Sequence, residues 1–291
     1  MIIVQLKGGL GNQMFQYAFG RSLSLRNNTS LFLDVSELNK KTTEHTMREY
    51  ELNNFNIQAT ISTTLFTSYT RSVYKLIAVM VNIFLKKKIV QRVKEKQFHY
   101  CPKQALISDN SILIGYWNSP KYFDGFSDIL RKDFSFNFIP NDKTKDLVEK
   151  IKSENAVSLH IRRGDYVTNL NANAYHGICD KAYYDKAIDT VLEKNKNAVF
   201  FIFTDDPIWV SQNFNVAAKS VIASSSDNLD GLQDMYLMTQ CKHAIIANST
   251  YSWWAAWLMS NPDKMVIAPL KWHNNISINI TDLFPDTWIT I

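Results

Sequence analysis

The chain has 291 residues, of which 46% are hydrophobic and 20% charged, a composition that excludes a disordered protein and suffices for one large domain or two smaller ones. Nine glycines and seven prolines exclude collagen-like and low-complexity chains. Lysine and arginine number 32 against 27 Asp and Glu, and the net charge of +5 is compatible with an anionic ligand but too small to indicate nucleic acid as a partner.

Short apolar runs alternate with helical patterns along the chain. In the first half the expected elements are a strand at residues 2–6, a helix at 12–26, a strand at 31–34, helix over 61–100, a strand at 111–116 and a helix at 120–134. In the second half they are strands at 156–161, 198–204, 217–223, 243–247 and 264–269, with helices at 181–194, 207–214, 231–241 and 249–259. This alternation predicts an α/β fold with parallel sheets covered on both faces. The polar run after Pro140 predicts a domain junction, with one domain at residues 1–142 and the other at 143–291.

A basic segment at residues 76–96 is the strongest membrane candidate. Its apolar part is only about half as long as the ~18 residues that span a bilayer, and three lysines at 86–88 follow it. The segment predicts either a surface that lies on an anionic membrane or a packed helix followed by a solvated face, which is the commoner outcome for basic runs. No signal peptide is recognisable at the start of the chain.

A glycine-rich turn with the sequence K-G-G-L-G-N-Q follows the first predicted strand at residues 7–13. Glycine lets the backbone approach a ligand, and the N-terminus of the next helix attracts anions. The turn is neither a G-x-G-x-x-G motif, because Met14 occupies the third glycine position, nor a Walker A loop. An anion site and a plain strand–helix turn therefore both remain open.

Residues 160–166, H-I-R-R-G-D-Y, end another apolar strand. Because alternate residues of a strand share a face, His160 and Arg162 should point together, and Ile161 and Arg163 should point away. An arginine fork suits a pyrophosphate, and an internal ion pair is the simpler alternative. We favour the anion for Arg162 and expect Asp165 to pair with Arg163.

Polar residues also follow two later strands. Asp205 and Asp206 end an apolar strand, but no third oxygen ligand for a metal lies nearby, so helix capping before Pro207 is favoured. Asn248 or Ser249 can cap the helix expected at residues 249–259, and the N-terminus of that helix can hold a phosphate. The tryptophans within this helix are typical of a core.

Four motifs together resemble those of the bacterial α-1,2-fucosyltransferases of glycosyltransferase family 11. They are K-G-G-L-G-N-Q-M-F-Q-Y-A from residue 7, H-I-R-R-G-D-Y at 160–166, F-T-D-D at 203–206 and N-S-T-Y-S-W-W-A-A-W at 248–257. Their combination is specific although each alone is not, and residues 40–110 match no motif. The resemblance implies a GT-B-like fold of two Rossmann-like domains, with the glycine loop and the acceptor side in the first and the nucleotide-sugar site in the second.

The resemblance further implies inverting transfer of L-fucose from GDP-β-L-fucose to the 2-hydroxyl of a terminal β-galactoside, without a metal or other cofactor, in surface glycan or O-antigen synthesis. The acceptor would be an oligosaccharide or a lipid-linked sugar. The implied roles are the β-phosphate for Arg162, the guanosine side for His160, the guanine for Asp234, and phosphate contacts for Ser249 or Thr250 and for the backbone around Gly9, Gly11 and Asn12.

Two residues are candidates for the base that deprotonates the attacking hydroxyl. They are Asp165 and His176, and an oxocarbenium-like transition state asks only modest deprotonation of either. Fixed donors such as Arg162 can stabilise the departing diphosphate without a metal. The alternatives are a fucosyltransferase of another linkage, a transferase that uses another nucleotide sugar, and a glycan-binding protein without catalysis. Animal relatives carry an N-terminal anchor that is missing here, so we expect a bacterial, cytoplasmic enzyme, free or peripheral on the inner face of the plasma membrane.

Overall fold

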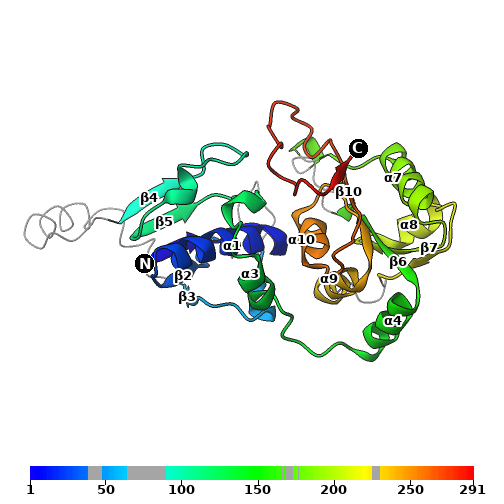
Figure 1. Ribbon diagram of the computed structural model, residues 1–291, viewed down its shortest axis with the longest axis horizontal. Helices are drawn as coiled ribbons and strands as arrows, with labels where there is room; N and C mark the ends of the chain where they lie inside the picture. The colour runs from blue at the N-terminus through cyan, green and yellow to red at the C-terminus, as the bar shows by residue number, and fades with distance from the viewer. Residues whose placement is uncertain (39–47, 64–89, 165–166, 168–172, 176, 225–229) are drawn as a thin grey trace, which may run out of the picture. The chain divides into compact units, whose positions relative to one another are not determined.

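The computed structural model describes residues 1–38, 48–63, 90–164, 167, 173–175, 177–224 and 230–291 (Figure 1). These residues form two compact units. Unit 1 comprises Met1–Asn137 and Asn279–Phe284, and unit 2 comprises Phe138–Ile278 and Pro285–Ile291. The chain thus passes from one unit to the other shortly before the expected junction, and the return of residues 279–284 to unit 1 had no signal in the sequence.

Unit 1 is built on a five-stranded parallel sheet with the strand order β3-β2-β1-β5-β4. The strands are β1 Ile2–Gln5, β2 Leu31–Asp34, β3 Thr60–Ser62, β4 Gln91–Lys94 and β5 Ser111–Ile114. Strand β1 is central, since Ile2 is in register with Leu31 on one side and with Ser111 on the other. The helical segments of unit 1 are α1 Leu10–Arg26, α3 Ser127–Asp133 and the short 3-10 turns Leu52–Asn54, Gln104–Leu106 and Pro120–Tyr122.

Helix α1 is buried on nearly every side. Most of its apolar side chains are buried, and so are the polar side chains of Gln13, Gln16 and Ser22. Phe19 packs on Trp117 and Tyr122, with ring centroids 4.5 Å and 4.7 Å apart. A helix enclosed this way forms the centre of a unit rather than its surface.

Two predictions for unit 1 were wrong where the structure describes the chain. Residues 61–100 were expected to be helical, yet residues 61–63 and 90–100 contain the end of β3 and all of β4, and residues 64–89 lie outside the described residues. Strand β4 lies at the edge of its sheet and is polar, so its sequence lacks an apolar strand pattern. Of the basic segment 76–96, only residues 90–96 are described. The expected helix at residues 120–134 is a 3-10 turn followed by α3, because Gly125 between them has a φ of 86° that a helix cannot contain.

Unit 2 has a six-stranded parallel sheet with the order β11-β10-β9-β6-β7-β8. Its strands are β6 Asn155–Ile161, β7 Ala198–Thr204, β8 Ser220–Ile222, β9 His243–Ile245, β10 Val266–Ala268 and β11 Ile289–Thr290. Its helices are α4 Asp142–Ser153, α7 Lys181–Lys194, α8 Pro207–Asn213, α9 Gly231–Gln240 and α10 Thr250–Leu258. Two separate parallel sheets, each with its own helices, confirm the predicted α/β class of two Rossmann-like, GT-B-like domains.

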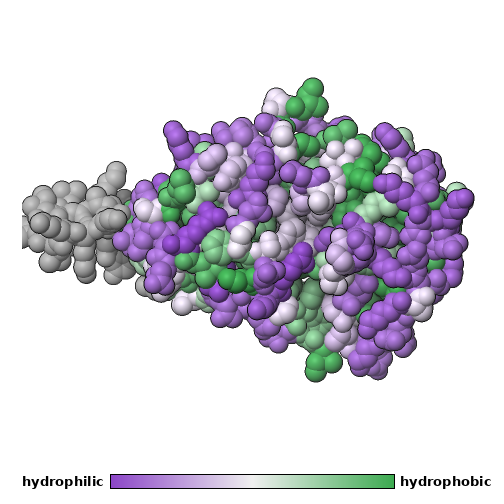
Figure 2. Space-filling view, viewed as in Figure 1, coloured by the Kyte–Doolittle hydropathy of each residue, from purple (hydrophilic) through white to green (hydrophobic). Residues whose placement is uncertain are grey.

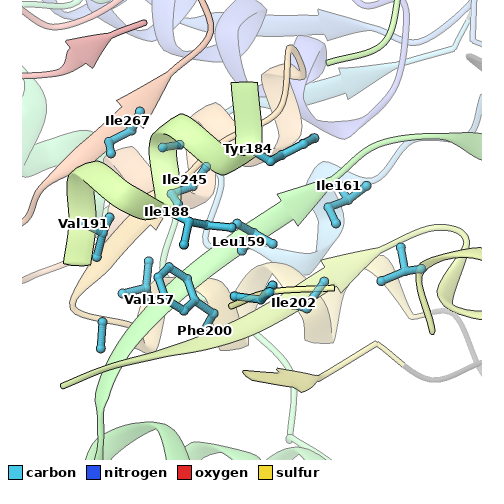
Figure 3. Packing of buried hydrophobic residues seen from close by; sticks show 14 residues of the cluster. Val157, Leu159, Ile161, Tyr184, Ile188, Val191, Phe200, Ile202, Ile245 and Ile267 are labelled. Atoms are coloured by element: carbon cyan, nitrogen blue, oxygen red, sulfur yellow. The ribbon is translucent and has the colours of Figure 1, made fainter. Parts of the chain in front are cut away.

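The core of unit 2 lies partly between its sheet and helix α7. Val157, Leu159 and Ile161 of β6 point to this side together with alternate residues of β7 (Figure 3). Tyr184, Ile188 and Val191 of α7 pack onto them. Because successive strand residues alternate between faces, His160 belongs to the opposite side of the sheet.

Hydrophilic side chains dominate the face of the molecule in Figure 2, where hydrophobic residues form small separate groups. Within the described ranges, no helix combines the length and the apolar character that crossing a bilayer requires.

Candidate active site

The sheet of unit 2 reverses its direction of growth between β6 and β9. The chain proceeds from β6 to β7 and β8 on one side, and from β9 to β10 and β11 on the other. Ligands of open α/β sheets bind beyond the carboxyl ends of the strands at such a reversal. The H-I-R-R motif ends β6, and residues 248–250 follow β9, so the topology brings these two motifs to the same crevice.

His160 lies at the end of β6, where its imidazole is 3% exposed. Its ring is 5.4 Å from that of Tyr251 in α10, which confirms that it points to the side opposite α7. Burial, together with the nearby charge of Arg162, lowers the pKa of His160 to about 3, so the imidazole is neutral at physiological pH. Among the described residues, its Nδ1 atom has no hydrogen-bond partner. A buried nitrogen without a partner is costly, so a ligand that binds it would gain free energy.

Arg162 forms an ion pair with Asp205, which follows β7. The distance from Nη1 of Arg162 to Oδ2 of Asp205 is 2.8 Å. The other oxygen of Asp205 accepts the amide of Arg163 at 2.8 Å. A Cβ atom at Gly164 would clash with the Asp205 carboxylate, so only glycine allows this approach. Arg162 is thus held at the carboxyl edge of the sheet by a carboxylate from the neighbouring strand.

Arg163 points to the other side of the sheet, as the alternation predicts. Its guanidinium lies 3.4 Å from the ring centroid of Trp209 in α8. Its Nε is 3.4 Å from Oδ2 of Asp206, whereas the partner expected from the sequence, Asp165, lies outside the described residues. Asp206 also caps α8, because its Oδ1 accepts the Trp209 amide at 3.2 Å. The capping prediction for the Asp205–Asp206 pair is therefore confirmed for Asp206, while Asp205 holds Arg162.

The first turn of α10 lies beside His160, whose ring contacts that of Tyr251. Ser249 is its N-cap residue, but the Ser249 side chain does not accept a hydrogen bond from the helix. Asn248 is occupied elsewhere, since its Nδ2 donates to the carbonyls of Gly177 and Trp272, each at 3.3 Å. The predicted core role of the tryptophans is confirmed, because Trp253 and Trp254 are fully buried. The first amides of α10, beginning at Thr250, therefore have no side-chain cap from Ser249. The first amides of a helix are the groups that bind anions.

Asp234 lies in the first turn of α9. The Ser224 hydroxyl donates a hydrogen bond to Oδ2 of Asp234 and accepts one from the Thr204 amide at 2.9 Å. The pKa of Asp234 is raised to about 6, mainly by burial; the Ser224 hydrogen bond opposes this shift, and the charge of the nearby Asp230 adds to it. The Tyr251 hydroxyl donates to the Gly231 carbonyl, which links α10 to the start of α9. Unit 2 thus carries His160, Arg162, Asp234, Ser249 and Thr250 on one edge.

The glycine turn lies in unit 1, at the carboxyl end of β1. Gly8 has a φ of 79°, Gly9 is the N-cap residue of α1, and a Cβ at Gly8 would press on Asn12. Burial raises the pKa of Glu51, and the nearby Arg48 and a hydrogen bond from the Leu10 amide to the Glu51 carboxylate oppose this rise. The helix N-terminus beside Gly9 and Gly11 therefore already faces a carboxylate.

Some predicted site residues lie outside the described part of the chain, and some residues of the site were not predicted from the sequence. Asp165 and His176, the two candidate bases, lie outside the described residues. The contacts of Asp205, Ser224 and Tyr251 were missed, although the alignment of Ile161 with Thr204 in neighbouring strands explains the position of Asp205. In the described part of the chain, no three His, Cys, Asp or Glu side chains gather closely enough to hold a metal ion.

Comparison with known proteins gives matches along the whole chain. The sequence model of Glycosyl transferase family 11 matches residues 1–291. An alpha-1,2-colitosyltransferase of Escherichia coli is 34% identical over 299 residues, which cover 100% of this chain and 99% of that protein. The O-antigen biosynthesis glycosyltransferase WbnK of Escherichia coli is 35% identical over 302 residues, covering 98% and 99%. A galactoside 2-alpha-L-fucosyltransferase SEC1 of Bos taurus is 33% identical over 103 residues, covering 35% of this chain and 28% of that protein.

Proposed function

Because the chain belongs to glycosyl transferase family 11 and is a glycosyltransferase, we propose that it transfers L-fucose from GDP-β-L-fucose to the 2-hydroxyl of a terminal β-galactoside. The acceptor is an oligosaccharide or a lipid-linked sugar of a surface glycan or O-antigen. The observation that carries the proposal is that Arg162 and the N-terminus of α10 follow two neighbouring strands, β6 and β9, at the strand reversal of unit 2.

A diphosphate suits this edge of the sheet. A guanidinium has five N–H donors, so Arg162 can remain paired with Asp205 while it binds phosphate oxygens. The first amides of α10, from Thr250 onward, add donors and the positive end of the helix dipole. The backbone around Gly9, Gly11 and Asn12 stays a sequence-based proposal for a further phosphate contact.

A guanine base suits the groups that flank the diphosphate position. The carboxylate of Asp234 can accept hydrogen bonds from two neighbouring N–H groups of guanine, and the Ser224 hydroxyl holds that carboxylate in place. His160 has a neutral imidazole and a buried Nδ1 for the guanosine side. The same donors and acceptors would fit uracil or cytosine less well, since neither offers this pair of adjacent N–H donors.

In the proposed reaction the acceptor oxygen attacks C1 of the fucosyl group from the face opposite the nucleotide. The bond from C1 to the β-phosphate oxygen breaks, and its electron pair leaves with GDP. A bond forms between C1 and the acceptor oxygen, which inverts the β-linkage to an α-linkage. The hydroxyl proton passes to a base, for which Asp165 and His176 are the candidates. Arg162 and the α10 amides stabilise the charge that builds on the leaving diphosphate.

The identity of the transferred sugar is the part that most needs a test, because a relative over the full length is named for colitose transfer. Colitose is fucose without its 3-hydroxyl group. The purified full chain is incubated with a galactoside acceptor and either GDP-fucose or GDP-colitose, and the product is analysed by NMR. An α-1,2-linked fucosyl galactoside formed with the higher kcat/KM supports the proposal. Preference for the colitosyl donor, another linkage, or galactoside binding without turnover contradicts it.

Metal independence is the second part of the proposal that is open to test. Arg162 and the α10 N-terminus supply the positive charge that a divalent cation otherwise gives. We expect the same rate after dialysis against EDTA as with added Mg²⁺ or Mn²⁺. Loss of activity in EDTA that Mn²⁺ restores would make the carboxylates near Arg162 candidate metal ligands instead.

A further inference from the structure

The sheet of unit 1 also has a point where its direction of growth reverses. Strand β1 continues through β2 to β3 on one side, while β5 and β4 occupy the other side. The crevice between the carboxyl ends of β1 and β5 is therefore the expected ligand position of this sheet. Lys7 follows β1, Tyr116 follows β5 and Glu95 follows β4, and none of the three has a role in the site of unit 2.

Lys7 is fixed at this crevice by its backbone and by its side chain. Its amide donates to the side chain of the buried Gln16 at 3.0 Å, and its carbonyl accepts from the same side chain at 3.1 Å. The ammonium lies 4.1 Å from the ring centroid of Tyr116, a cation–π contact. The position of the charge is therefore set by the fold and does not depend on a flexible surface side chain.

Glu95 is fixed equally well. Its two carboxylate oxygens accept the amides of Tyr116 and Trp117, at 2.7 Å and 2.9 Å. A Cβ atom at Gly115 would clash with Glu95, and Trp117 has a φ of 58°, so the chain adopts a strained turn to bring its amides to the carboxylate. Burial raises the pKa of Glu95, and the attraction of Lys7 counteracts part of this shift. A carboxylate can accept about four hydrogen bonds, so two remain possible for a ligand.

The charges of this cluster indicate the class of ligand. Lys7 and Glu95 attract each other and carry opposite charges, so an anion is repelled by the carboxylate and a cation by the ammonium. All three side chains are half-buried and reach solvent. A neutral sugar carries hydroxyl groups on adjacent carbons. One hydroxyl can accept a hydrogen bond from the ammonium while its neighbour donates a hydrogen bond to the carboxylate. We propose that Lys7, Glu95 and Tyr116 form a subsite for the neutral acceptor sugar, which rests on the glycosyl transfer proposed above.

The test compares variants of the full chain and begins with Lys7→Met, which removes the charge and keeps most of the side-chain volume. We expect a rise of at least tenfold in KM for methyl β-D-galactopyranoside, with the affinity for GDP within twofold of wild type. The matched control is Arg26→Met, because the Arg26 guanidinium also lies over a ring of unit 1, 5.3 Å from the centroid of Phe126, at the other end of α1. Arg26→Met should leave both values unchanged. Equal KM values in wild type and Lys7→Met, or parallel losses of galactoside and GDP binding, overturn the proposal.

A second pair of variants separates sugar binding from a merely structural role. Glu95→Gln should raise KM for the galactoside, and Lys7→Arg, which keeps the charge, should stay within threefold of wild type. A structural role predicts instead that Lys7→Met and Lys7→Arg both lower the unfolding temperature without a separate effect on KM. If Glu95→Gln does not fold, the comparison of Lys7→Met with Lys7→Arg decides.

Direct binding distinguishes failure of this subsite from failure of the proposed function. Saturation-transfer NMR with methyl β-D-galactopyranoside needs no donor. If wild type binds the sugar and Lys7→Met does not, the subsite stands even when no fucosyl transfer occurs. If wild type transfers fucose and Lys7→Met binds and uses the galactoside normally, the subsite is wrong and the function stands.

Discussion

Arg162 and Asp205 form an ion pair at 2.8 Å across the carboxyl ends of two neighbouring strands of unit 2. The side chains are 24% and 22% exposed, so the pair is accessible to a ligand without being loosely held. A partly desolvated arginine that is already oriented loses little conformational entropy when it binds a diphosphate. Asp205, directly after β7, is therefore best understood as the residue that positions Arg162.

Replacement of Arg162 by alanine tests the phosphate assignment. Loss of one fixed donor to a developing oxyanion typically lowers the rate about 10²–10³-fold, or about 2.7–4 kcal/mol. We expect kcat/KM of Arg162→Ala to fall by about that factor, and GDP binding to weaken in calorimetric titration. Wild-type kcat/KM in this variant would remove Arg162 from the diphosphate site.

The adjacent residue offers a matched control for Arg162. Arg163→Ala removes the same charge one position along the chain, but from the side of the sheet where Arg163 stacks on Trp209. We expect a lower unfolding temperature, because the stacking and the contact with Asp206 are lost, and unchanged GDP affinity. A folded Arg163→Ala protein as inactive as Arg162→Ala would transfer the assignment to Arg163 or to both residues.

Asp234→Asn should have opposite effects on stability and on GDP binding. Burial raises the pKa of Asp234 from 3.8 to about 6, so the folded chain binds this proton more tightly than the unfolded chain. The contribution of Asp234 to the unfolding free energy is therefore largest below its unfolded pKa and is lost as the pH rises through about 6. At pH 7 the asparagine variant no longer holds a buried charge, and we expect a higher unfolding temperature without ligand. It also cannot accept two guanine N–H groups, so GDP should bind more weakly.

The pH dependence of GDP binding checks the same residue independently. In the proposed site guanine binds the ionised carboxylate of Asp234, so we expect the GDP affinity of the wild-type protein to fall as the pH drops through about 6. In Asp234→Asn this dependence should be absent between pH 5 and 7, a window around that value. Identical pH profiles for both proteins would show that Asp234 is not the group that meets the guanine.

The sequence predicts central strands much better than edge strands. Strand β7 and helix α7 have the expected bounds, Ala198–Thr204 and Lys181–Lys194, because a fully buried strand is apolar throughout and the helix begins at a capping aspartate. Strand β4 lies at the edge of its sheet with exposed Arg92 and Lys94, so it has no apolar pattern to detect. Strand β11 has only two residues, too few for any periodicity.

The part of the candidate site that could be predicted from the sequence is the part set by the alternation of side chains between the two faces of one strand. Strand periodicity alone separates His160 from Arg163, and the structure has them on opposite sides of the sheet. The partner of Arg162 depends on the alignment of β6 with β7, which no local pattern contains. The crevice with Lys7 and Glu95 was missed for the same reason, because three strands distant in sequence bring its residues together.

A buried network in unit 1 provides a prediction about stability that is independent of the proposed activity. Asp133, at the end of α3, accepts a hydrogen bond from the Tyr17 hydroxyl at 2.7 Å and pairs with Nε of Arg21 at 2.9 Å, so it joins α3 to α1. The Tyr17 oxygen also accepts the Gln58 amide at 3.0 Å. Asp133→Ala leaves a guanidinium without its carboxylate in a largely buried position.

Removing one partner of a buried pair costs about 3–5 kcal/mol, and Arg21 keeps some contact with water because its side chain is 19% exposed. We therefore expect Asp133→Ala to lower the free energy of unfolding by about 2–3 kcal/mol in urea titration. Asp128→Ala is the control, since Asp128 lies on the same helix in its first turn, and should change stability by less than about 0.5 kcal/mol. A similar small change for Asp133→Ala would mean that Tyr17 and Arg21 find other partners and that α1 and α3 are held together by their apolar contacts alone.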